Sequence, residues 1–256
     1  MEDAEAGSTD PMTRGRFIAL GDIHGCIFAL DAILAALELG PSDHLICLGD
    51  CIDTGRNSKE VVDRLIEVSQ LCDLQLIRGN HEEMFLASLE DPKVVQAWLN
   101  CGGMETVNSY RFCGSIEDIP KRHIEFIQQS VDYVETSDAI LVHANYEPDE
   151  NPADWPVHTL RWSILDESSP RPHTSGKRVI VGHTEQRHGE ILDLGYLTCI
   201  DTYCHGSGWL TALDLQSGKV WQASRWGVLR ERLDDGESLL EAHRLLHEDD
   251  SESDAS

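Results

Sequence analysis

The stretch Arg78-Gly79-Asn80-His81-Glu82 decides the fold, because it completes a series of three related motifs. Gly21-Asp22-Ile23-His24-Gly25 comes first, and Gly49-Asp50-Cys51-Ile52-Asp53-Thr54-Gly55 comes second. Residues 17–20, 45–48 and 74–77, which precede the motifs, have strand character. Asp50 follows Asp22 by 28 residues and Asn80 follows Asp50 by 30, about one strand-helix-strand unit. Three parallel strands should therefore carry these side chains to one sheet edge.

The segments between and after these strands have helical character. Residues 27–39 are rich in Ala and Leu and end at Gly40-Pro41, while residues 58–70 place apolar side chains at helical spacing. Residues 92–130 also look helical, with breaks near Gly102-Gly103 and Pro120. The alternation over residues 16–90 predicts an α/β fold with parallel strands.

The second half of the chain adds two buried strands and a region of short ones. Residues 139–142 and 178–181 are apolar strands that end just before His143 and His183. Short segments separated by Gly-bearing turns then predict antiparallel strands at 191–194, 197–201, 209–215 and 219–223. Five of the nine prolines fall within residues 148–172, which predicts a long ordered loop.

The composition predicts one domain between two acidic tails. We expect a disordered tail at 1–14, the domain at 15–227, and an acidic tail with a short helix at 228–256. An acidic N-terminus and the absence of a long apolar run favour a cytoplasmic location. The eight cysteines form no C-x-x-C pair, as expected for reduced thiols.

The formal charge of −26 argues against two classes of partner. The tails hold part of this charge, but the body still has 32 acidic and 16 basic residues. Nucleic acid and anionic membranes are therefore poor partners. The oligomeric state does not follow from the sequence.

The polar side chains at the strand ends are suited to a pair of metal ions. Asp22 and His24 point the same way from an extended segment and can hold one ion. Asp50 can share an oxygen with a second ion, for which Asn80, His143 and His183 supply the remaining ligands. Oxygen and nitrogen donors without a thiolate suit Mn²⁺, the first choice, or Fe or Zn²⁺.

Two such ions predict hydrolysis of phosphate esters. Cations roughly 3.5–4 Å apart can clamp the attacking and leaving oxygens and supply a bridging hydroxide near neutral pH. His81 can protonate the leaving group, and Asp53 can hold the His81 imidazole in its protonated form. Glu82 is expected to be a helix N-terminal acid that favours the dipole.

These motifs resemble those of the phosphoprotein phosphatase branch of the metallophosphoesterases, in particular its compact bacterial members. Leu141-Val142-His143-Ala144 and Val181-Gly182-His183-Thr184 continue the family pattern, so the resemblance covers about residues 15–225. It implies a single-domain β-sandwich flanked by helices (α/β/β/α) and the same eight site residues. Their roles would be metal binding by Asp22, His24, Asp50, Asn80, His143 and His183, and proton donation by the pair Asp53 and His81.

The chain departs from the family pattern at the phosphate clamps. Thr54 and Ile164 stand where the family has arginines, so Arg56 and Arg161 are the candidate replacements. The resemblance implies a phosphomonoester hydrolase, most directly a phosphatase for phosphoserine or phosphothreonine in proteins. Hydrolysis of dinucleoside polyphosphates such as diadenosine tetraphosphate is the alternative. A metal-holding binding protein with weak turnover is the second alternative.

Overall fold

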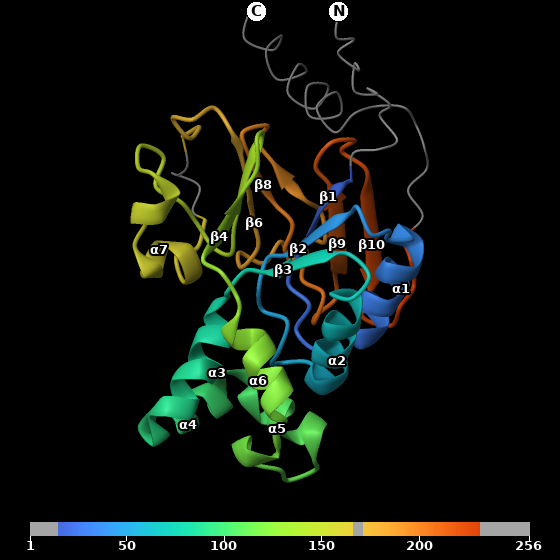
Figure 1. The fold of residues 1–256 in the computed structure, drawn as a ribbon, viewed down its shortest axis with the longest axis vertical. Helices are drawn as coiled ribbons and strands as arrows, with labels where there is room; N and C mark the ends of the chain where they lie inside the picture. Colours follow the sequence, from blue (N-terminus) through green and yellow to red (C-terminus); the bar gives the residue numbers. More distant parts are fainter. Residues whose placement is uncertain (1–14, 166–170, 231–256) are drawn as a thin grey trace, which may run out of the picture.

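Two five-stranded sheets pack face to face in the computed structural model, which describes residues 15–165 and 171–230. The first sheet has the order β10-β9-β1-β2-β3 and the second β4-β5-β6-β8-β7. Figure 1 shows the first sheet beside α1 and α2, the second sheet beside α7, and α3–α6 below. This α/β/β/α arrangement confirms the predicted single-domain β-sandwich.

The strands follow the sequence pattern closely. Their bounds are β1 Phe17–Leu20, β2 His44–Cys47, β3 Asp73–Leu76, β4 Tyr133–Glu135, β5 Ala139–Val142, β6 Arg178–Val181, β7 Leu192–Asp193, β8 Leu197–Cys199, β9 Trp209–Asp214 and β10 Val220–Ser224. The helices are α1 Ile27–Leu37, α2 Ser58–Val68, α3 Asn80–Glu90, α4 Pro92–Trp98, α5 Met104–Tyr110, α6 Lys121–Gln128 and α7 Val157–Arg161.

Parallel pairing brings the carboxyl ends of the central strands together. β1, β2 and β3 are mutually parallel, as are β5, β6 and β8 in the other sheet. The expected antiparallel pairing holds for β9 and β10 and for the β7–β8 pair. The expectation is wrong for β8 and β6, which pair in parallel. The connection between these two strands returns the chain to the end of the sheet where β6 begins.

Three apolar layers hold the sandwich together. The layer between the sheets includes Ala19, Ile46, Leu141 and Ile180, all almost fully buried. A second layer packs α1 and α2 on the outer face of the first sheet, and a third packs Trp155 and Leu160 on the second. The proline-rich segment therefore contains a short 3₁₀ turn, Pro152–Asp154, and helix α7, rather than only a loop.

The described residues after 227, the expected end of the domain, contact strand β10. Leu229 forms a β-bridge with Ala223, and the Arg230 backbone N–H donates to the Gln222 carbonyl at 2.8 Å. The tail at 1–14 and the predicted helix beyond residue 230 lie outside the described residues. None of the described helices is long and apolar enough to cross a membrane.

Candidate metal centre and acid pair

Asp50 lies at the centre of the candidate site, just beyond the end of β2. Its Oδ2 lies 3.7 Å from His24 Nε2, 3.5 Å from His143 Nε2 and 3.9 Å from His81 Nε2. His183 joins Asp50 and His143 in a second cluster whose ligand atoms lie within 4.8 Å of one another. The structure therefore brings together residues from the ends of four strands around one buried carboxylate.

Asn80 and Asp22 occupy the margins of these clusters. Asn80 Oδ1 lies 3.1 Å from His143 Nε2. Asp22 belongs to neither three-residue cluster, but its Oδ2 accepts the His183 backbone N–H at 3.1 Å. Its Oδ1 is buried without a hydrogen-bond partner among the described residues, and a Cβ at Gly182 would lie only 2.1 Å from it.

Backbone carbonyls fix the orientation of the imidazole rings. His24 Nδ1 donates to the Ile52 carbonyl at 3.1 Å, and His143 Nδ1 donates to the Leu48 carbonyl at 2.8 Å. Each neutral ring then presents an unprotonated Nε2 toward Asp50, in the manner of metal-binding histidines. The His143 Nε2 and Asn80 Oδ1 atoms are consequently two acceptors facing each other at 3.1 Å. A cation between them would resolve this contact.

The pKa values of the buried ligands in the protein without cations also indicate a metal site. Burial raises the pKa of Asp22 well above its usual value and raises the pKa of Asp50 to about 8. Burial also lowers the pKa of His24 and His143 well below the usual value. A divalent cation binds neutral imidazoles and ionised carboxylates. Its charge would offset the cost of ionising the buried carboxylates Asp22 and Asp50. The residues therefore fit divalent metal ions.

Asp53 and His81 form the predicted pair. His81 Nδ1 lies 2.9 Å from Asp53 Oδ2, which also accepts the Trp98 Nε1–H at 2.9 Å. The Thr106 hydroxyl lies 2.6 Å from Asp53 Oδ1, and Asp53 is fully buried. Burial lowers the pKa of His81, but the charge of Asp50 and the hydrogen bond and charge of Asp53 outweigh it. The net effect raises that pKa to about 9.

Glu82 does more than favour the dipole at the start of α3. Its fully buried carboxylate accepts backbone N–H groups from Asp50 at 2.8 Å, Cys51 at 2.9 Å and Gly79 at 3.0 Å. These bonds join the loop after β2 to the first turn of α3. A Cβ at Gly79 would lie 2.1 Å from Asp50 Oδ1, so only glycine allows this approach.

Several site residues have left-handed backbone conformations. The φ angles are +44° for His24, +47° for Asp50, +69° for Asp53 and +60° for His183. Such angles are uncommon outside glycine and cluster at functional sites.

The two predicted phosphate clamps have different surroundings. Arg161 is almost buried and forms ion pairs with Glu83 and Asp132, so its guanidinium is already engaged. Arg56 is exposed and has no hydrogen-bond or ion-pair partner among the described residues. Of these two arginines, both among the described residues, Arg56 is therefore the one free to bind an anion.

The sequence reasoning did not assign Trp98 or Thr106 to the acid pair. These residues lie 45 and 53 positions after Asp53. At such separations along the chain, no local sequence pattern indicates these contacts.

The comparisons with known proteins agree with this geometry. The model of the calcineurin-like phosphoesterases matches residues 15–196. The chain belongs to this family. A symmetrical bis(5'-nucleosyl)-tetraphosphatase of Klebsiella pneumoniae is 43% identical over 70 residues, which are 27% of this chain and 24% of that protein. The matched part is thus about a quarter of that relative's length.

Solved structures share the fold at low sequence identity. A candidate diadenosine tetraphosphatase has a TM-score of 0.63 and 19% identity, over 84% of this chain and 95% of that one. A serine/threonine phosphatase of Saccharomyces cerevisiae has a TM-score of 0.56 and 16% identity, over 88% and 83%. At these identities the likeness concerns the fold alone.

Proposed function

We propose that this protein is a phosphomonoester hydrolase that uses two divalent metal ions, with Mn²⁺ as the first candidate and Fe or Zn²⁺ as alternatives. The proposed donors are Asp22, His24, Asp50, Asn80, His143 and His183. The observation that carries the proposal is the Asp50 carboxylate, which lies among unprotonated imidazole nitrogens and beside the Asp53–His81 pair. The cytoplasm is the proposed location.

The bound cations would lower the pKa of water and offset the charge of the phosphate. Asp53 accepts the His81 Nδ1–H and thereby leaves Nε2 to carry the proton that is transferred. In the reaction a water oxygen bonds to phosphorus and the ester P–O bond breaks. The His81 proton passes to the leaving oxygen, which gives an alcohol, and the attacking water releases one proton to solvent as its oxygen becomes part of inorganic phosphate. A proton from solvent then restores the protonated His81.

The first test is hydrolysis of p-nitrophenyl phosphate with Mn²⁺, Fe²⁺ or Zn²⁺. We expect turnover by the wild type and a decrease in kcat of about 10²–10⁴-fold in His81→Asn, because the general acid is lost. Metal content measured on the same samples separates loss of the acid from loss of the metals. A wild type that binds metal but is silent with every cation would favour the binding-protein alternative.

Two substrate classes are compatible with metal ions and a general acid. In a dinucleoside polyphosphate the bond that breaks is a phosphoanhydride P–O bond, and the leaving group is a nucleotide instead of an alcohol. Phosphoserine or phosphothreonine in proteins is the class that the motif resemblance favours. The 43% identity over 70 residues to a bis(5'-nucleosyl)-tetraphosphatase favours dinucleoside polyphosphates. The values of kcat/KM for a phosphopeptide and for diadenosine tetraphosphate, measured side by side, rank the two.

A further inference from the structure

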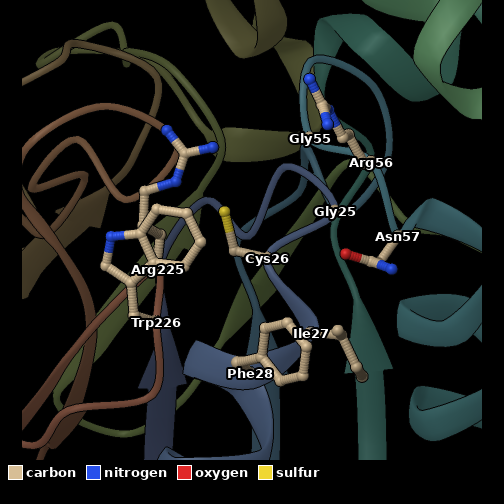
Figure 2. Close-up of a pocket in the computed structure, with 9 residues that line it drawn as sticks. All are labelled: Gly25, Cys26, Ile27, Phe28, Gly55, Arg56, Asn57, Arg225 and Trp226. Carbon is tan, nitrogen blue, oxygen red and sulfur yellow. The ribbon is translucent and has the colours of Figure 1, made fainter.

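A pocket of about 340 Å³ lies beside the loops that carry His24 and Asp53. Its lining residues come from the start of α1, from the loop after Asp53 and from the turn after β10: Gly25, Cys26, Ile27, Phe28, Gly55, Arg56, Asn57, Arg225 and Trp226. Figure 2 shows the two guanidinium groups in the upper half of the view and the Phe28 ring below them. No role in the proposed metal centre accounts for this pocket.

The pocket is basic although the chain is strongly acidic. Arg56 and Arg225 line it, and no Asp or Glu does, in a chain with 46 acidic and 20 basic residues. Arg56 has no ion-pair partner in the described part of the chain. Arg225 donates through Nη1 to the His205 carbonyl at 2.8 Å, and no carboxylate is paired with it there. Two uncompensated guanidinium groups favour an anionic ligand.

The same pocket exposes aromatic surface. Phe28 is 56% exposed and Trp226 is 73% exposed. The turn that carries Trp226 packs tightly on α1: Gly227 has φ of +80°, and a Cβ there would lie 2.9 Å from the Phe28 carbonyl oxygen. The segments that carry the two rings are therefore in close contact, and Arg225 Cζ lies 5.1 Å from the centroid of the Trp226 ring. The exposed surface of both rings suits a flat aromatic group.

A short path connects the pocket with the candidate metal centre. Arg225 contacts the backbone of His205, and the His205 ring lies edge-on to the His24 ring with centroids 4.6 Å apart. Gly25, which lines the pocket, directly follows His24. The pocket therefore adjoins the loop that carries one proposed metal ligand.

We propose that this pocket binds the nucleotide end of a nucleoside polyphosphate substrate. The base packs on Phe28 and Trp226, while phosphate oxygens contact Arg56 and Arg225. A volume of about 340 Å³ is near the lower end of the roughly 300–1,000 Å³ of small-molecule sites. It accommodates one nucleotide rather than the surface of a folded partner. As an assignment of substrate, the inference rests on the proposed hydrolase function.

Binding of ADP tests the pocket without turnover. With the full-length, metal-loaded protein, we expect ADP to bind at least about tenfold more tightly than inorganic phosphate in calorimetry. In Trp226→Ser or Phe28→Ser, ADP affinity should fall about tenfold more than phosphate affinity, because base–aromatic stacking is lost. Phe112→Ser is the matched control, since Phe112 is 86% exposed and lies outside the pocket. Equal affinities for ADP and phosphate, or equal losses in all three variants, would overturn the proposal.

Kinetics separate this inference from the hydrolase proposal. Arg225→Gln should lower kcat/KM for diadenosine tetraphosphate about tenfold more than kcat/KM for phosphoserine, mainly through KM. Arg111→Gln, an exposed arginine outside the pocket, should change neither ratio. Equal decreases for both substrates would refute the proposed role of the pocket while leaving the hydrolase proposal intact.

A protein that binds ADP through these residues yet hydrolyses neither substrate would refute the hydrolase proposal alone. The nucleotide assignment would also be overturned if substitution of Phe28 and Trp226 lowered kcat/KM for a phosphopeptide as much as for diadenosine tetraphosphate.

Discussion

Replacement of Asp53 by Asn tests the acid pair directly. Asp53 Oδ2 accepts N–H groups from His81 and Trp98, both at 2.9 Å, and Oδ1 lies 2.6 Å from the Thr106 hydroxyl. An asparagine whose carbonyl oxygen takes the Oδ2 position preserves both N–H bonds, and its amide can donate to the Thr106 oxygen. The fold should therefore survive. The negative charge that stabilises the protonated His81 ring is lost.

The expected magnitude follows from that charge. A hydrogen bond to a charged group contributes about 1.5–3 kcal/mol, which corresponds to roughly 10-fold to 150-fold in a rate constant. We therefore expect Asp53→Asn to lower kcat by roughly that factor. This decrease in kcat should not exceed the decrease in His81→Asn. The decrease should be larger for phosphoserine than for p-nitrophenyl phosphate, because a serine alkoxide needs protonation more than p-nitrophenolate does.

The assay is kcat for both substrates, with metal content and thermal unfolding as controls for folding. Asp73→Asn is the matched variant, because Asp73 accepts from His44 Nδ1 at 2.8 Å in a partly exposed pair at the opposite end of β3. We expect it to leave both rates unchanged. An Asp53→Asn protein that keeps its metals and its kcat would refute the role of Asp53. Equal decreases for the two substrates would refute proton donation as the step affected.

Three further variants test other parts of the site and the fold. Asp50→Asn should lower the metal content from the proposed two ions to fewer than one per chain in elemental analysis, and retention of two would contradict the proposal that Asp50 is a shared ligand. Glu82→Gln should lower the free energy of unfolding in EDTA by about 3 kcal/mol, since an amide nitrogen would face backbone N–H donors. Hydrogen bonds from Arg16 and Gly40 lower the pKa of Asp43 to about 2, so its stabilisation is present above about pH 4 and is lost as the pH falls toward 2. Solvent screens the ion pair because the Arg16 side chain is one-third exposed, so Asp43→Asn should lower the free energy of unfolding at pH 7 by about 1 kcal/mol. In urea titrations the variant should also lose less stability than the wild type between about pH 4 and pH 2.

The proximity of the proposed ligands could be expected because strand ends can be recognised in the sequence. β1, β2, β5 and β6 were identified within one residue of their bounds, and each is followed by a polar residue of the site. In a parallel sheet, the carboxyl ends of strands share one edge, so the clustering of Asp50 with His143 and His183 could be expected. The pairing of β8 with β6 could not, because short strands with polar ends carry no signal for direction.

The surroundings of Asp53 could not be predicted for a different reason. Trp98 ends α4 and Thr106 lies in α5, and both reach Asp53 only because the chain kinks at Leu99–Gly103, where Gly102 has φ of +105°. The Thr54 backbone N–H donates to the Gly102 carbonyl at 3.2 Å, and this hydrogen bond joins the kinked segment to the loop that carries Asp53. Such tertiary contacts leave no local pattern in the sequence.

Glu82 shows that stability and site geometry depend on the same bonds. The carboxylate accepts from the backbone of Asp50 and Cys51 on one side and of Gly79 on the other. It therefore fixes the distance between the end of β2, where Asp50 adopts a left-handed backbone, and the start of α3, where Asn80 and His81 lie. Because the backbone of Asp50 is costly in isolation, these charge-assisted bonds offset the strain at the same place where it arises. A side chain without a role in bond breaking thus determines whether the proposed ligands meet.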